Sequence, residues 1–391
     1  MRIHPLIKWG LLGGGLVFAL LVVSFVVLLV YVVHTQHAYA AMPDTGDLKE
    51  RINKMGEGYV ASHKNAALVI AVYRQGKEYV QGFGAISEAN TNRPDARTIF
   101  EIGSVTKVFT ATVLSEMVDN GEVKLDDPIS LYLPKGVTSP AFNGHEITLE
   151  NLATHTSGLP RLPDNLLANA KDQNNPYADY TTKDLYDSLA TVKLKSVPGA
   201  KSEYSNYGFG LLGKILELKT GKSYEELIQE KVCTPLGMQS TTTRLSAEQK
   251  ERLAPGHSPD GGVVPNWDFN SLTGCGAVRS DAADLLKLIE ASLGQTNSEI
   301  STALNHMQEY HFREFSGGIG LGWQIAETVE QLTLYWHNGG TGGYVSFVGF
   351  DKKHQVGVVI LSSYGDAFAG DNSVDKMGMN LLTVGSKVSL E

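Results

Sequence analysis

The sequence predicts an α+β fold in which helices flank an antiparallel sheet and a mostly helical lobe is inserted. Strand-like runs lie near both ends of the chain, within residues 67–84 and 331–362, whereas helical patterns dominate the middle. Because strands from distant segments can join one sheet, we expect a sheet lobe from about residues 48–103 and 294–391. The helical lobe is then about residues 104–293, and a site is expected in the crevice between the lobes.

The composition narrows the class of protein. The 391-residue chain carries 33 Lys and Arg against 42 Asp and Glu, which gives a net charge of −9, so no nucleic-acid partner is predicted. Cysteine occurs only at Cys233 and Cys275, which excludes a disulfide-rich scaffold and a Cys-rich metal module. The two thiols could pair in an oxidising compartment, or both could stay free and buried.

The N-terminal segment predicts a membrane element. Residues 11–33 form an almost unbroken apolar run, long enough to span a bilayer, with Arg2 and Lys8 before it. This charge distribution keeps the N-terminus in the cytoplasm and sends the rest across. We therefore expect residues 1–40 to be a transmembrane anchor; the alternative is a signal segment cleaved after Ala40. Both alternatives place the folded part of the chain outside the cytoplasm, in a bacterial periplasm or at the cell surface.

The folded part begins with a helix and a hairpin. A linker at residues 41–47, which contains Pro and Gly, precedes apolar residues at helical spacing over about residues 48–63. The β-branched run 67–74, a Gln-Gly-Lys turn and the run 78–84 predict a β-hairpin. The main folded domain is expected to span residues 48–391.

The middle of the chain predicts several helices. Start signals occur at Thr148, Thr182 and Ser280, and stop signals at Gly121 and Gly221.

The remaining segments complete the expected architecture. Residues 164–180, polar and rich in Asn and Asp, predict a surface loop or partial lid. Three strand-like runs follow at residues 331–337, 344–351 and 355–362, and a helix is expected from about residue 372.

A candidate nucleophile lies at the start of a helical pattern. The octet FEIGSVTK at residues 100–107 places Ser104 and Lys107 three residues apart, on one helix face. A serine hydroxyl is a poor nucleophile until a base takes its proton, and a desolvated lysine can be that base. Ser-X-X-Lys is common in long chains, so a surface helix cap with a solvated lysine is the alternative.

The octet resembles the nucleophile signature of the class C β-lactamase and penicillin-binding protein family, with Thr106 where Ser or Ala is commoner. Further along, Tyr204 and Asn206 resemble the family's Tyr-X-Asn element, and the resemblance covers about residues 48–382 in consistent order. It implies a β-lactamase/transpeptidase-like fold. It also implies that Tyr204 and Lys107 share the base and acid roles while Asn206 holds the substrate.

The third element is WHNGG at residues 336–340, where the family's β-lactamases carry Lys-Thr-Gly, so His337 replaces the lysine. The resemblance implies that His337, Gly339 and Gly340 bind substrate, and that the N–H groups of Gly340 and Ser104 form the oxyanion hole. A histidine with a pKa of about 6.5 is mostly neutral at pH 7.5, so recognition of an anionic substrate should weaken as pH rises. His-X-Gly variants are similar to esterases, aminopeptidases and transpeptidase-like members.

The other candidate features predict no cofactor. His155, in a loop that resembles a cleft-lining loop of the family, is expected to be structural. His306 and His311 are five residues apart, off a shared helix face, so no metal site is predicted. The Gly-rich stretch at residues 339–343 lacks the Lys-Ser/Thr ending of a phosphate loop, so no nucleotide is expected.

The sequence therefore predicts a membrane-anchored or secreted serine hydrolase that forms an acyl-enzyme on Ser104, without metal or organic cofactor. Its expected substrates are β-lactams or D-amino-acid peptides of peptidoglycan, and its other partner is the membrane, through the N-terminal helix. A carboxylesterase of the same family is one alternative. A non-catalytic, membrane-tethered sensor of penicillin or wall fragments is the other.

Overall fold

The computed structural model describes residues 47–365, 373–388 and 390. The predicted anchor or signal segment lies outside these residues, as does the linker except Asp47. Within the described part, every helix is too short or too polar to cross a bilayer. Asp47–Glu391 forms one compact unit.

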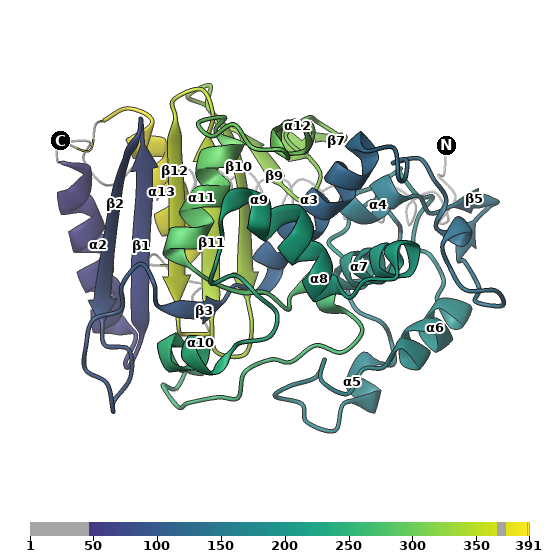
Figure 1. Cartoon of the computed structure of the whole chain (residues 1–391), viewed down its shortest axis with the longest axis horizontal. Helices are drawn as coiled ribbons and strands as arrows, with labels where there is room; N and C mark the ends of the chain where they lie inside the picture. The colour runs from purple at the N-terminus through teal and green to yellow at the C-terminus, as the bar shows by residue number, and fades with distance from the viewer. Residues whose placement is uncertain (1–46, 366–372, 389, 391) are drawn as a thin grey trace, which may run out of the picture. The chain divides into compact units, whose positions relative to one another are not determined.

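One antiparallel sheet of eight strands organises this unit, in the order β2-β1-β12-β11-β10-β9-β8-β7 (Figure 1). The hairpin near the N-terminus thus pairs with the last strand of the chain, as the sequence predicts. In sheet order, the strands are β2 (Lys77–Gly84), β1 (Ala67–Arg74), β12 (Val356–Ser362), β11 (Val345–Asp351), β10 (Thr333–Gly340), β9 (Gln324–Glu327), β8 (Gly317–Ile319) and β7 (Phe312–Glu314).

Helices cover both faces of the central strands. On one face lie α2 (Leu48–Ser62) and α13 (Val374–Gly385), and on the other lies α11 (Ala282–Ser292). Because both faces are covered, every residue of β11 and β12 is buried, which explains why apolar side chains lie on both faces of these two strands rather than alternating with exposed polar ones.

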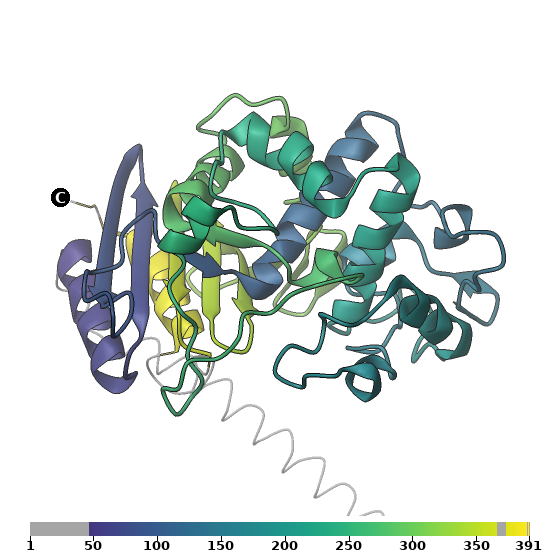
Figure 2. The same ribbon diagram turned by 60° about the horizontal axis from the view of Figure 1, so that its bottom comes forward.

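Most of the remaining helices, among them α4 to α8, gather beside the sheet rather than on its faces (Figures 1 and 2). The remaining helices are α3 (Thr106–Asp119), α4 (Leu149–Ala153), α5 (Leu166–Asn169), α6 (Thr182–Thr191), α7 (Asn206–Thr220), α8 (Tyr224–Ile228), α9 (Thr234–Leu236), α10 (Ala247–Arg252) and α12 (Ser301–His306). Two small antiparallel pairs join them, β3 (Ile99–Glu101) with β6 (Arg279–Asp281) and β4 (Ala141–Phe142) with β5 (His145–Glu146).

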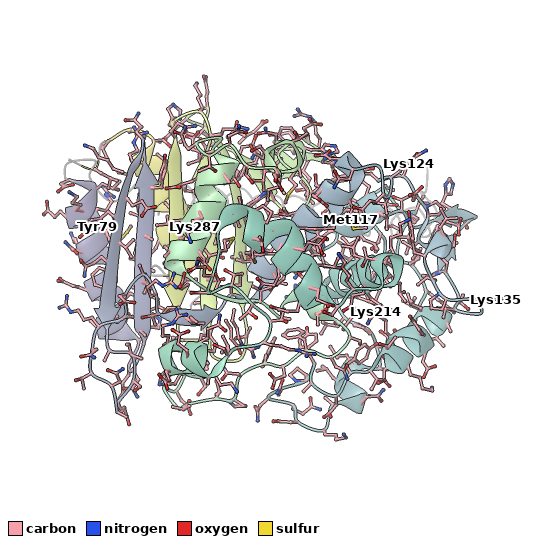
Figure 3. The ribbon with its side chains drawn as sticks, in the orientation of Figure 1. Tyr79, Met117, Lys124, Lys135, Lys214 and Lys287 are labelled. Carbon is pink, nitrogen blue, oxygen red and sulfur yellow. The ribbon has the colours of Figure 1, made fainter. Side chains whose placement is uncertain are left out.

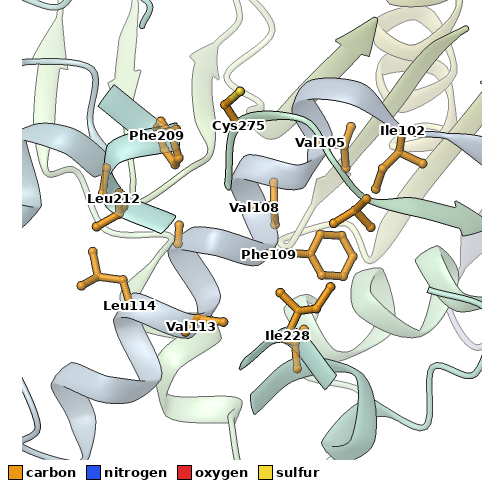
Figure 4. Close-up of a cluster of buried hydrophobic side chains, with 14 of the residues drawn as sticks. Ile102, Val105, Val108, Phe109, Val113, Leu114, Phe209, Leu212, Ile228 and Cys275 are labelled. Atoms are coloured by element: carbon orange, nitrogen blue, oxygen red, sulfur yellow. The ribbon is translucent and has the colours of Figure 1, made fainter. Parts of the chain in front are cut away.

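The helix α3 is the centre of the larger hydrophobic core. Eleven of its fourteen residues are buried, and their apolar side chains lie next to Phe209 and Leu212 of α7 and Ile228 of α8 (Figure 4). A short 3₁₀ turn, Gly103–Val105, leads into α3. The residues of this turn are therefore held by a helix that is itself mostly buried.

The structure confirms the helix, the hairpin, the three late strands and the C-terminal helix predicted from the sequence. It corrects three details. The helix α11, assigned to the helical lobe by its place in the chain, packs on the sheet through β1, β11 and β12. The segment 164–180 is not simply a surface loop, because it contains α5 and buries Tyr177. The edge strands β7, β8 and β9 were not expected, since three or four residues are too few for an alternating pattern to stand out.

Candidate active site

Ser104 lies in the 3₁₀ turn that opens α3, next to the end of β10. Gly103 adopts a φ of +48°, and a Cβ added there would lie 2.6 Å from the backbone nitrogen of Gly340. Across the same contact, the Ser346 hydroxyl donates to the carbonyl of Ile102 at 2.8 Å. Residue 103 must therefore be glycine, because its φ is positive and no side chain fits between the two backbones. The serine and the strand end are thereby fixed side by side.

The Lys107 side chain is fully buried and points at Ser104. Its Nζ donates to Ser104 Oγ at 2.9 Å, to Asn206 Oδ1 at 2.8 Å and to the carbonyl of Cys275 at 2.8 Å. An ammonium has three N–H donors, and here each one meets an oxygen. By contrast, Lys124 and Lys135 extend into solvent (Figure 3). The structure thus excludes the alternative of a solvated lysine on a surface helix.

Tyr204 and Asn206 enter the site from the start of α7. Ser205 caps this helix by accepting from the N–H of Gly208 at 2.9 Å, which places Asn206 in the first turn beside Lys107. The Tyr204 ring lies over the same lysine, with Nζ 4.8 Å from the ring centroid. Three residues that the sequence analysis selected from two distant motifs therefore converge on one point.

The buried imidazole of His155 supports this arrangement. Its ring lies against Tyr204, with 4.4 Å between centroids, and its Nδ1 accepts from the N–H of Ser205 at 3.0 Å. Burial, and then the charge of Lys107, hold the pKa of His155 well below its ordinary value, so the ring is neutral. A neutral ring has the lone pair that this hydrogen bond needs, so His155 positions the α7 N-terminus.

His337 does not titrate as the sequence analysis expected. Burial, and then Lys107, lower its pKa to about 3, so it remains neutral at every physiological pH. Its Nδ1 donates to the carbonyl of Asn338 at 2.6 Å, and its ring lies 6.3 Å from Tyr204 between centroids. The predicted loss of charge at this residue near neutral pH is therefore wrong, because a sequence does not show how far a strand-end histidine is buried.

A cleft of about 570 Å³ opens over Ser104. It includes Tyr204, Asn206, Gly339 and Gly340 of the predicted site, whereas His337 is absent from its walls. The sequence analysis missed the other wall residues, which are Arg161, Leu162, Tyr177, Trp267, Asn338, Thr341 and Asp375. Three of them had an available signal: Asn338 lies inside the quoted motif at residues 336–340, Thr341 follows that motif directly, and Arg161 follows the loop that resembles a cleft-lining segment of the family.

Tyr177 and Arg161 line the cleft on the side of the helices and contact Asn206 and Tyr204. The amide of Asn206 donates to the Tyr177 hydroxyl at 3.2 Å, and the Arg161 guanidinium lies 4.9 Å from the Tyr204 ring centroid. Burial raises the pKa of Tyr177, so this phenol stays protonated.

Asp375, in the first turn of α13, supplies a carboxyl group to the opposite side. Its Oδ2 accepts from the Asn338 amide at 2.7 Å, while its buried Oδ1 has no hydrogen-bond partner among the described residues. Burial raises the pKa of Asp375 to about 6. The chain therefore has a neutral imidazole at the position where the resemblance leads us to expect a lysine, and the Asp375 carboxyl group nearby.

The described residues contain one further cluster of metal-ligand types, His306, Glu309 and His311, which does not line this cleft. Cys233 and Cys275 are free and buried. Of the two alternatives from the sequence, the structure has the free, buried thiols rather than the disulfide pair.

Comparisons with known proteins agree with this geometry. A family model described as beta-lactamase matches residues 52–374. A D-alanyl-D-alanine-carboxypeptidase/endopeptidase of Escherichia coli K12 is 30% identical over 309 residues, covering 75% of this chain and 78% of that protein. A beta-lactamase of the same strain is 26% identical over 339 residues, covering 78% and 85%.

Solved structures show the same fold. A beta-lactamase/D-alanine carboxypeptidase from Yersinia pestis superposes with a TM-score of 0.73 at 25% identity, covering 83% of this chain and 95% of that one. A class C beta-lactamase from Rhodobacter sphaeroides gives a TM-score of 0.72 at 22% identity, covering 85% and 98%. The expected β-lactamase/transpeptidase-like α+β fold is confirmed.

Proposed function

Since this chain belongs to the beta-lactamase family and is a serine hydrolase of the β-lactamase or DD-peptidase type, we propose that it works through an acyl-enzyme on Ser104. The observation that carries this proposal is the 2.9 Å contact between Lys107 Nζ and Ser104 Oγ inside a buried, fully hydrogen-bonded cluster.

The reaction follows from the positions of the side chains. To act as the base, the Lys107 ammonium first releases one proton to solvent; Nζ then accepts the Ser104 proton across the 2.9 Å contact while Oγ bonds to the substrate carbonyl carbon. The resulting oxyanion lies near the N–H groups of Ser104 and Gly340, which donate to it. Tyr204, over the lysine, passes the proton to the leaving group as the carbonyl–leaving group bond breaks. Water then hydrolyses the acyl ester and restores the serine.

We assign D-amino-acid peptides or β-lactams as the substrate class, because relatives carry D-alanyl-D-alanine-carboxypeptidase/endopeptidase and beta-lactamase as their names. Both substrates present a carbonyl to the nucleophile in the same way. The Asn206 amide, already beside Lys107, is placed to hold the substrate amide carbonyl.

A carboxylesterase activity is the second candidate, and one observation favours it. The neutral His337 offers no cation for a substrate carboxylate, and Asp375 adds a negative charge on that side of the cleft once it is ionised. A neutral ester avoids this repulsion. A peptide whose reacting end lacks a free carboxylate avoids it as well, which favours endopeptidase over carboxypeptidase substrates.

The decisive experiment is a search for acyl adducts by intact-protein and peptide mass spectrometry. The full chain is mixed with a chromogenic cephalosporin, a short-chain nitrophenyl ester and a D-Ala-D-Ala peptide, with Ser104→Ala as the control. We expect an adduct on the peptide that contains Ser104 and none in the variant. Labelling that persists in Ser104→Ala rules out the nucleophile. A stable penicillin adduct without turnover of any substrate would instead indicate the sensor.

We also propose that this domain works outside the cytoplasm. The support is the apolar run at residues 11–33 and the positive charges before it. Protease treatment of intact spheroplasts should digest the catalytic domain; protection from the protease would contradict this location.

A further inference from the structure

A second cluster of reactive side chains lies where α12 turns into β7. The helix ends at His306, and the chain reverses before Phe312. The reversal brings the ring of His311 back to 5.2 Å from that of His306, between centroids. With Glu309 of the turn, each residue offers one ligand atom, and these atoms lie within 4.8 Å of one another. The spacing argument from the sequence fails here because the two histidines do not share a helix.

The hydrogen bonds of His311 orient it as a metal ligand would be oriented. Its Nδ1 lies 2.8 Å from the Glu150 carboxylate, and its Nε2 lies 3.2 Å from the carbonyl oxygen of His306. A neutral imidazole has one N–H, which the carboxylate attracts to Nδ1. Nε2 lies at hydrogen-bond distance from the His306 carbonyl, so the ring either carries a second proton that fills this contact or turns Nε2 from the carbonyl toward a metal ion. A carboxylate on the far ring nitrogen is the usual second partner of a metal-bound histidine.

The surroundings favour a dication. Asp119 Oδ1 lies 3.9 Å from Nδ1 of His306, so three carboxylates, Asp119, Glu150 and Glu309, surround two imidazoles. The His311 side chain is only 7% exposed, whereas Glu309 is open to solvent, so an ion would be partly enclosed yet reachable.

We propose that His306, Glu309 and His311 bind a divalent transition metal of the Zn²⁺ type. Two imidazoles and a carboxylate suit Zn²⁺, Ni²⁺ or Cu²⁺, whereas Ca²⁺ and Mg²⁺ prefer oxygen ligands throughout. The site does not line the Ser104 cleft, so its role is structural. It ties α12 and β7 to the C-terminal end of α3, through Asp119, and to α4, through Glu150.

The test is isothermal titration of Zn²⁺ into the full, untagged chain after treatment with a chelator. We expect one site per chain that His306→Ala/His311→Ala removes. Glu150→Gln, which changes only the partner of His311, should weaken binding by about 10- to 100-fold. His145→Ala is the matched control, because His145 is an exposed histidine outside the cluster, and it should bind Zn²⁺ like the wild type.

Thermal unfolding provides a second measurement. Zn²⁺ should raise the midpoint of the wild type by a few degrees and leave that of the double variant unchanged. Circular dichroism verifies that the variants fold. Absence of Zn²⁺ binding by the wild type, or equal binding by the wild type and the double variant, overturns the proposal. His306→Gln/His311→Gln replaces the alanine variant if the latter does not fold.

Discussion

Among single residues, Lys107 is the one on which the proposed chemistry depends most. Lys107→Ala removes the group that would take the Ser104 proton, so we expect acylation to slow by about 10²- to 10⁴-fold. The matched control is Lys231→Ala, since Lys231 is also buried but pairs with Glu116 and Glu122. The control should lose stability and keep its acylation rate. Stopped-flow labelling by a fluorescent penicillin measures the acylation rate of each variant, and chemical denaturation measures its stability. Equal slowing of acylation in the two variants would contradict the assignment.

Asp375 makes a prediction about pH. Its pKa of about 6, above the ordinary value of 3.8, means that it gains its charge between about pH 5 and 7. An anionic cephalosporin should therefore lose kcat/KM over this range, by roughly 3- to 10-fold for one nearby repulsive charge, while a neutral ester should not. Asp375→Asn should abolish the difference between the two substrates. An identical pH profile for both substrates in the wild type would show that Asp375 does not affect substrate charge.

His337→Gln is the companion variant for that experiment. Because His337 is already neutral, replacing it with another neutral residue should leave the position of the pH step unchanged. If the change in kcat/KM near pH 6 disappears in His337→Gln and persists in Asp375→Asn, the titrating group is His337 and not Asp375.

The sequence identified those site residues that belong to local patterns. Ser104 and Lys107 are neighbours on one helical turn, and Tyr204 and Asn206 mark the start of another helix, so spacing was enough to select them. Asp375 belongs to no such pattern. It reaches the cleft only because α13 packs on β11 and β12 beside the strand that carries Asn338. The pKa of His337 depends on burial, which is likewise a property of the packed molecule.

Among elements, the contact between β10 and the 3₁₀ turn at Ser104 positions the nucleophile. A Cβ on Gly339 would lie 1.9 Å from the carbonyl oxygen of Ile102, so Gly339→Ala must push the strand away from the turn. We expect acylation to fall more than tenfold and stability to fall by about 1–3 kcal/mol. Chemical denaturation and penicillin labelling measure the two effects.

Gly58→Ala is the control for that variant. Nothing lies within 4 Å of a Cβ at Gly58, on the exposed side of α2, so alanine should raise stability slightly, by up to about 1 kcal/mol, and leave acylation intact. If Gly339→Ala behaves in the same way, the close approach of strand and turn does not position the serine.

At the scale of the whole molecule, the sheet and the helices on it are assembled from both ends of the chain. β1, near the start, pairs with β2 on one side and with β12, near the end, on the other, and α11 packs on β1 and β12. Local patterns predicted these elements well, because each has its own turn and cap signals. The strand order could not be predicted in the same way. The general rule that distant strands can join one sheet predicts that the two ends meet, but it does not specify which strands pair.

The junction between α11 and the edge strand β2 makes stability depend on pH. Burial, and then a hydrogen bond that the protonated Glu290 donates to Glu78, raise the pKa of Glu290 to about 7, above its ordinary value of 4.5. A raised carboxyl pKa means that the folded state holds the proton more tightly than the unfolded state, so stability is lost as pH rises from about 4.5 through 7. Glu290→Gln keeps the hydrogen bond without a charge, and it should be more stable than the wild type at pH 8. Because Glu290 is only half-buried, solvent screening reduces the expected gain to about 1 kcal/mol. Urea unfolding of both proteins at pH 4.5 and pH 8 measures the difference, and a gain of equal size at the two values would show that Glu290 ionises normally.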